Sequence, residues 1–489
     1  DAANYFAGAL HYLQNGELTG WTTRRPLSAL HLAGLLGASG SLKYALFILT
    51  AFSTGALLTM IAVLGRSIGI GAGAVAAAVL IPFYFPTVGT VMSENIGLTL
   101  GGCGFALMWL SLHGHDRCQS ALFAFGAGLM GLGLAARAGA MFVLPLLILY
   151  AGWYFRGSNR FSFKALAWTA SAIGFAFATN AALIALFGVH DVAGFSNFSY
   201  TLYGLVTGGH PWEYIHQNVP TLRSLPEAAQ ASEAYRLALA HLVAHPLDAV
   251  LGILRRYNDF IFNGRWFRIE GIGGLRFLFV VVALVGLFRA IRYHRAPSES
   301  FILVGTIGTL LSAPFIGDGG MRVHAATVAF SAALTANTIA GWCRRPAPES
   351  RDGTGIAPVP IVIAGFVLFF MVSAVSLRGH IRPPIDSFAC QENTLPVAFS
   401  TVPDAGINLL STRDILKIKT RAWLGLTLPR GFDELQPPIR FGLAINLSDQ
   451  RGAQMWITSP TGRQLPRRFN ACGRQIGDIF HLNTVQALP

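Results

Sequence analysis

Charged side chains are scarce in this sequence. Asp, Glu, Lys and Arg together make up 12% of its 489 residues, whereas hydrophobic residues make up 53%. Soluble domains carry about 25% charged residues, so a water-soluble fold of this length would have too little polar surface. The scarcity excludes an ordinary soluble globular protein and indicates a chain that lies largely in lipid.

Signals for nucleotides and nucleic acids are also missing. The formal net charge is +13, but Lys and Arg are scattered between apolar segments and form no patch interleaved with aromatic residues. No P-loop or dinucleotide fingerprint occurs. We therefore expect no nucleic acid partner, and we interpret the positive charge as a mark of membrane topology, because Lys and Arg collect in short cytoplasmic loops.

Long hydrophobic runs are what the sequence has in place of charge. Apolar stretches of about 17–24 residues are long enough to cross a hydrocarbon core about 30 Å thick. Backbone polar groups in lipid must be paired within the same segment, so these stretches should be helices. The sequence predicts a mainly α, polytopic membrane protein with about ten transmembrane helices. They are 43–64, 68–87, 96–113, 120–136, 139–155, 165–188, 276–293, 300–316, 323–342 and 358–378.

Basic residues mark every second loop, and such loops are cytoplasmic. The opposite side then receives residues 1–42, 189–275 and 379–489, with the transmembrane helices at 43–188 and 276–378. We expect the inner (plasma) membrane of a bacterium, with the long loops extracytoplasmic. The marking residues are Arg66, Arg117, Arg156, Arg160, Lys164, Arg289, Arg292, Arg295, Arg344, Arg345 and Arg351.

The first outer segment begins without a hydrophobic stretch before it. We therefore expect a further transmembrane helix upstream of residue 1, with a cleaved signal peptide as the alternative. Residues 3–14 and 27–37 are short and amphipathic, so 1–42 is predicted to be a loop with amphipathic helices that do not span the membrane.

The long outer loop is expected to be structured. Residues 231–262 have the apolar spacing of helices, and Pro246 divides them into two. We predict that these helices lie along the membrane surface.

The tail from about residue 379 has a different composition. Short alternating runs at Arg440–Leu447 and Gln454–Thr458 stand between Pro and Gly turns and are typical of strands. We predict a small β-rich extracytoplasmic domain. Cys390 and Cys472 both fall in it, which predicts a disulfide in an oxidising compartment, with two free thiols as the alternative. No Cys and His spacing in the chain matches a zinc site.

Candidate catalytic residues lie on the outer side. Asp1 is a carboxylate at a membrane boundary and could act as a general base towards a hydroxyl, while Arg24 and Arg25 suit a phosphate because guanidinium groups donate two parallel hydrogen bonds. The alternative is that Asp1 caps a helix and the arginines face lipid headgroups. Glu94, in Ser-Glu-Asn between two spans, is a second candidate acid, or else an ordinary helix cap.

Further outer residues could bind a substrate. Arg137 lies between two spans, where a charge is costly unless it faces protein, water or headgroups. Asp318 and Arg322 share a glycine-rich turn, and a local ion pair is the alternative interpretation. The stretch 200–216 contains Tyr203, His210 and Trp212, which could hold a sugar or form an interfacial aromatic belt.

Together these segments resemble the GT-C superfamily of membrane glycosyltransferases, in particular the protein O-mannosyltransferase and lipid A aminoarabinose transferase group. The similarity covers about residues 1–378. It rests on D-x-x-x-Y-x-x-x-A-L…G…R-R-P-L (1–27), Ser93-Glu94-Asn95, Arg137, Leu202-Tyr203-Gly204…Gly208-Gly209, His245-Pro246 and Asp318…Arg322. Many relatives have two adjacent acids in the first loop, whereas Ala2 follows Asp1 here, so a divalent metal is left open as a cofactor.

The resemblance implies transfer of a sugar from a polyprenyl-phosphate donor in the membrane lipid to a glycan, lipid or protein acceptor, with inversion. Asp1 would accept the proton of the acceptor, and Arg24, Arg25, Arg137 and Arg322 would bind the donor phosphate. The competing hypothesis is a transporter or flippase of a lipid or small solute, which should show broken, charged spans and internal symmetry. A polysaccharide ligase and a non-catalytic assembly protein are two further hypotheses that the sequence leaves open.

Overall fold

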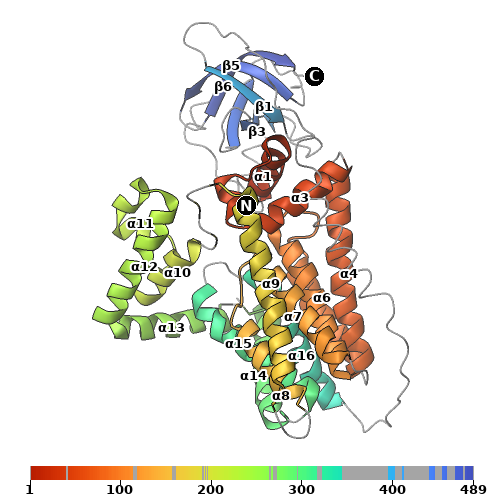
Figure 1. The fold of residues 1–489 in the computed structure, drawn as a ribbon. Coiled ribbons are helices and arrows are strands. Elements are labelled where there is room, and N and C mark those ends of the chain that lie inside the picture. Colours follow the sequence, from red (N-terminus) through yellow and green to blue (C-terminus); the bar gives the residue numbers. More distant parts are fainter. Residues whose placement is uncertain are drawn as a thin grey trace. The chain divides into compact units, whose positions relative to one another are not determined.

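The computed structural model describes most of residues 2–343 and, beyond them, six strands. The gaps are 40–41, 114–117, 157–160, 190–191, 193, 195, 264–265, 268–272, 295, 317–321, 344–394 and the connections between the strands. The described part up to residue 343 is helical (Figure 1). The prediction of a mainly α fold is therefore confirmed.

Helices follow one another through the first 343 residues with short connections. In the first half they are α1 (Ala2–Asn15), α2 (Gly20–Thr23), α3 (Pro26–Ser39), α4 (Leu42–Ile68), α5 (Ile70–Tyr84), α6 (Ser93–His113), α7 (Gln119–Ala136), α8 (Val143–Tyr154) and α9 (Phe163–Phe187). In the second half they are α10 (Asn197–Val206), α11 (Tyr214–Asn218), the 3₁₀ helix η1 (Pro220–Ser224), α12 (Glu227–Ala244), α13 (Pro246–Ile261), α14 (Gly273–Arg292), α15 (Pro297–Ile316) and α16 (Val328–Cys343).

Five of these helices are long and apolar enough to cross a membrane: α4 from Tyr44, α6, α7, α9 and α15. They coincide with five of the ten predicted spans, and the protein is a multi-pass membrane protein. Helices α12 and α13 also satisfy the same criteria as a pair, but they are bent by 107°.

Three more predicted spans form shorter helices than expected. The run 68–87 gives α5, which has 15 residues and contains Pro82, and the run 139–155 gives α8, which has 12 residues. The run 323–342 begins with a 3₁₀ turn, so α16 starts only at Val328 and has 16 residues. The predicted span 358–378 lies outside the described residues.

The chain divides into two compact units. One contains 1–22, 29–47 and 370–489, and the other contains 23–28 and 48–369. In the first unit, the Tyr5 ring of α1 lies edge-on to Trp21, with ring centroids 4.7 Å apart.

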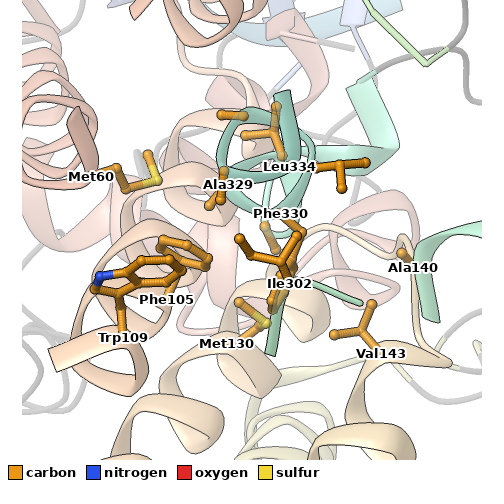
Figure 2. Packing of buried hydrophobic residues seen from close by; sticks show 14 of the residues in the cluster. Met60, Phe105, Trp109, Met130, Ala140, Val143, Ile302, Ala329, Phe330 and Leu334 are labelled. Carbon is orange, nitrogen blue, oxygen red and sulfur yellow. The ribbon is translucent and has the colours of Figure 1, made fainter. Parts of the chain in front are cut away.

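The core of the second unit is dominated by aromatic side chains from separate helices. Phe105 of α6 packs against Phe301 of α15 and Phe330 of α16, with ring centroids 5.6 and 5.3 Å apart. Figure 2 shows Phe105, Trp109, Met130 and Phe330 within this cluster. Gly305 allows the arrangement, because a Cβ there would lie 2.0 Å from the Phe330 ring. The centre of the helical bundle is thus filled.

The strands form one six-stranded sheet in the order β1-β5-β6-β4-β3-β2, in which only β4 and β6 are parallel among the described pairs. Two of them, β3 and β4, lie over the two runs from which strands are predicted. A separate outer domain remains a prediction. The strands are β1 (Leu395–Thr401), β2 (Leu410–Ser411), β3 (Arg440–Asn446), β4 (Gln454–Ser459), β5 (Arg468–Ile476) and β6 (Ile479–Ala487).

Candidate functional site

One buried carboxylate lies beside two arginines at the ends of three helical segments. Glu94 Oε1 is 3.5 Å from an Nη of Arg137 and 3.6 Å from Nε of Arg322. Glu94 and Arg137 are almost completely buried, whereas the Arg322 side chain is 40% exposed. These three residues, here called the Glu94 cluster, all belong to the second unit. The structure thus brings together three of the residues singled out from the sequence.

Helix ends hold the members of the Glu94 cluster. Glu94 is the second residue of α6, where the positive end of the helix dipole favours a carboxylate. Arg137 ends α7 in an extended conformation, and its backbone N–H donates to Gly133. Arg322 begins the 3₁₀ turn that leads into α16. Each charge therefore lies where a helix stops or starts.

Glycines allow the three segments to approach closely. A Cβ at Gly101 of α6 would lie 2.1 Å from the Ala326 carbonyl oxygen, and one at Gly139 would lie 1.9 Å from the Val323 carbonyl oxygen. Gly133 of α7 is similarly close to the backbone of Gly97 and Gly101. The segment that follows Arg322 therefore packs directly against the backbones of α6 and α7, as small residues permit in membrane helices.

The loop before α6 is fixed by a side-chain amide. Asn95 donates hydrogen bonds to the carbonyl oxygens of Thr87 and Thr90, at 3.0 and 2.7 Å. Ser93 donates to Glu94 Oε2 at 3.3 Å. Asn95 therefore closes the loop, and Ser93 contacts the Glu94 carboxylate.

The Glu94 cluster contains two guanidinium groups and one carboxylate. Glu94 Oε1 accepts no hydrogen bond from the described residues, although it is buried. Buried polar atoms usually have a hydrogen-bond partner, so this oxygen calls for an explanation. The exposed part of Arg322 suits an anionic ligand such as a phosphate.

Arg24 belongs to a different arrangement. Its Nε donates to Glu227 Oε1 at 2.6 Å, and an Nη donates to Asn197 Oδ1 at 3.1 Å. Ser196 completes the contact by donating to Glu227 Oε1 at 2.8 Å. Arg24 thus connects the turn before α3 to the starts of α10 and α12. The neighbouring Arg25 is half-buried in that turn.

Aromatic residues of the long loop come together around a glycine turn. His210 stacks on Tyr214 with ring centroids 4.0 Å apart, and Tyr203 stacks on Tyr214 at 6.4 Å. Gly208 and Gly209 have positive φ, and Arg255 of α13 donates to the Gly208 carbonyl at 2.7 Å. These residues share a small core of the loop.

The edge of this loop core contains a second histidine. His216 packs near Trp212, which is partly exposed, and burial lowers the pKa of His216. Nearby Arg223 lowers this pKa further, whereas Glu213 opposes the shift.

Four predicted site residues cannot be placed in this way. Asp1, Asp318 and Cys390 lie outside the described residues, and Cys472 lies in β5 without a described side chain. The predicted general base and the predicted disulfide therefore remain predictions. Within the described part of the chain, no group of three His, Cys, Asp or Glu residues is arranged to hold a metal ion.

Comparison with known proteins adds no family. No protein-family model matches this chain, and no curated protein matches its sequence.

Sequence reasoning missed the partner of Arg24 and the importance of particular glycines. Glu227 lies 203 positions from Arg24, and nothing in the sequence links the two. The spacing Gly97-x-x-x-Gly101 is a recognisable signal for close helix packing and could have identified the contact surface of α6.

Proposed function

We propose that the protein is a membrane glycosyltransferase that moves a sugar from a polyprenyl-phosphate-linked donor to an acceptor hydroxyl on the outer face of the membrane. The observation that supports it most is the Glu94 cluster, because it holds the partly exposed Arg322 guanidinium beside a buried carboxylate, where it could bind a departing phosphate. Arg322 would bind that phosphate and Arg137 would hold Glu94 in place. The resemblance of the sequence to GT-C enzymes supports the same assignment.

In the proposed reaction, the acceptor oxygen bonds to the anomeric carbon as the bond between that carbon and the phosphate oxygen breaks. The phosphate leaves with the electron pair, and arginine stabilises its negative charge. A carboxylate accepts the proton of the acceptor hydroxyl, and Asp1 is the proposed base. Tyr203, His210 and Trp212 would contact the sugar or its acceptor, which is a glycan, lipid or protein.

The proposal includes a setting for the site. About ten transmembrane helices would place it on the extracytoplasmic side of a bacterial inner membrane. The aromatic contact of Phe105, Phe301 and Phe330 supports an enzyme over a transporter, because it packs α6, α15 and α16 directly against one another.

The test is a lipid extract of cells that lack the protein. We expect mass spectrometry to detect an accumulating polyprenyl-phosphate-linked sugar, which the wild-type gene removes and the Arg322→Gln variant does not. The matched control is Arg236→Gln, because Arg236 is exposed and pairs with Glu233 three residues away. No accumulating lipid, or full activity of Arg322→Gln, would disprove the proposal. Movement of an unmodified lipid across sealed vesicles would instead identify a flippase.

A further inference from the structure

Two helices of the long loop form a sharply bent pair, here called the elbow (Glu227–Ile261). Helices α12 and α13 meet at His245-Pro246 with a bend of 107° (Figure 1). Pro246 is the first residue of α13, where its missing N–H and fixed φ are tolerated. Together the helices are apolar enough for a membrane span, but the bend prevents them from crossing as one rod.

The exposed face of α13 is apolar. Leu247, Val250, Leu251 and Leu254 follow the i, i+3, i+4, i+7 spacing of one helix face, and each is at least half exposed. The opposite face packs within the protein, since a Cβ at Gly252 would lie 2.0 Å from the Leu205 carbonyl oxygen of α10. In water, α13 would expose its apolar face to solvent.

The exposed face of α12 changes along its length. Ser232 and Arg236 make it polar in the first half, whereas Leu239 and Val243 make it apolar near the bend. Val243 is 83% exposed. The apolar surface therefore increases towards the bend and continues into α13 through Leu247. A helix that enters lipid from water would show this gradient.

Polar side chains also lie near the bend, where His245 is exposed and Asp248 is partly exposed. His241 Nε2 lies 3.1 Å from Asp248 Oδ2, so the two side chains pair with each other across the bend. Both lie outside the stripes formed by the exposed apolar residues, by helical spacing. Within each helix of the elbow the backbone polar groups are paired, as lipid requires, whereas the last carbonyls of α12 and the first N–H groups of α13 lie outside this pairing.

The elbow adjoins a membrane span. Tyr257 of α13 donates a hydrogen bond to the carbonyl oxygen of Leu310 in α15, at 3.1 Å. Leu311, the next residue of that span, is exposed. Leu254 lies one turn before Tyr257 along α13. Exposed apolar residues of α13 and of α15 therefore lie close in sequence to the hydrogen bond that joins the two helices.

From these observations we infer that the exposed apolar face of the elbow is immersed in the hydrocarbon of one leaflet, with acyl chains covering Leu239, Val243, Leu247, Val250, Leu251 and Leu254. This goes beyond helices that rest on the membrane surface, and it does not depend on the proposed enzymatic activity. Lipid is the occupant because the elbow is hydrogen-bonded to a membrane span, and because a contiguous apolar patch of this kind is rare on a water-exposed face.

The inference can be tested with a small fluorescent amino acid introduced at Leu251 or at Val243, in the purified protein reconstituted in lipid vesicles. The control position is Ser224 of η1, which is exposed and polar and lies outside the elbow. Fluorescence is measured with doxyl-labelled lipids and, separately, with iodide in the aqueous phase. Variants are compared only if they elute from size exclusion like the wild type.

Doxyl lipids should reduce fluorescence at positions 251 and 243 by about twofold and leave position 224 nearly unchanged, while iodide should do the reverse. Quenching by iodide at 251 and 243 would show that the face is in water and would overturn the inference. Protection from both quenchers would show that protein covers the face, for example a second copy of the chain, and would overturn it as well.

Discussion

Two arginine–glutamate contacts in this protein differ in almost every respect. Arg24 and Glu227 lie 2.6 Å apart, are partly exposed, and have Ser196 and Asn197 to complete their hydrogen bonds. The Glu94 cluster is buried, its contacts are 3.5–3.6 Å long, and two arginines share one carboxylate. In the first contact Glu227 Oε1 accepts two hydrogen bonds, whereas in the second Glu94 Oε1 accepts none from the described residues.

The difference in hydrogen bonding indicates that the Arg24–Glu227 contact is structural and that the Glu94 cluster is the candidate site. Satisfied polar contacts fix the chain in one arrangement, whereas a buried group that lacks its full set of partners carries a cost. Proteins retain such a cost mainly where function requires it. The Glu94 cluster therefore has the properties of a binding site, and the Arg24 contact has those of a connection between segments.

Removal of the buried carboxylate should have the largest effect on stability. The Glu94→Gln variant removes the negative charge beside the buried Arg137, which we expect to destabilise the protein by about 3 kcal/mol. Thermal unfolding in detergent, followed by fluorescence, measures the change. The Glu94→Gln/Arg137→Gln double variant should recover part of the loss, because the buried positive charge is removed as well.

The matched control is Glu227→Gln. The amide keeps an acceptor for Arg24 and Ser196 at a partly exposed position, so we expect a cost of about 1 kcal/mol. The sugar transfer that we propose should persist in this variant and disappear in Glu94→Gln. If both variants lost stability and activity to the same extent, the Arg24–Glu227 contact could not be distinguished from the Glu94 cluster as a structural contact.

The next effect concerns the glycines that shape the Glu94 cluster. Gly101→Ala places a methyl group against the Ala326 backbone, which cannot move like a flexible side chain, and should destabilise the protein by about 1–3 kcal/mol. Gly55→Ala in α4 is the control, since a Cβ there has no atom within 4 Å. The comparison uses the midpoint of thermal unfolding, and equal midpoints would contradict the close packing of α6.

The sequence predicts the long spans well, because composition alone determines which segments enter lipid. It predicts the short helices poorly. Helix α8 begins only at Val143, since Arg137 adopts an extended conformation and Gly139 packs against Val323, and neither contact is local in sequence. The run from 323 was expected to be a span, but its start packs against α6 and α7 as a turn.

The candidate site was predicted in part for the same reason. Glu94, Arg137 and Arg322 can be identified as charges at helix ends, because a charge near lipid is costly unless it faces protein, water or headgroups. The pairing of Arg24 with Glu227 depends on how the long loop folds back, which no local pattern encodes. The sequence therefore identifies charged residues that are costly to bury, whereas the structure shows which of them have hydrogen-bond partners.

The last prediction concerns a buried histidine that is neutral at pH 7, and it tests how the stability of the protein depends on pH. His31 of α3 is buried, and burial lowers its pKa to about 3. His31 is therefore neutral at pH 7. In the unfolded chain its pKa would be about 6.5. Below that pH the unfolded state binds a proton that the folded state excludes, so stability is lost as the pH falls from about 6.5 towards 3.

At pH 5 the loss should be about 2 kcal/mol relative to pH 7. The His31→Gln variant cannot titrate, so its unfolding midpoint should fall less between pH 7 and pH 5 than that of the wild type. His245→Gln, at an exposed position, should keep the wild-type pH dependence. If His31→Gln loses as much stability on acidification as the wild type, burial of a neutral group does not control the acid response.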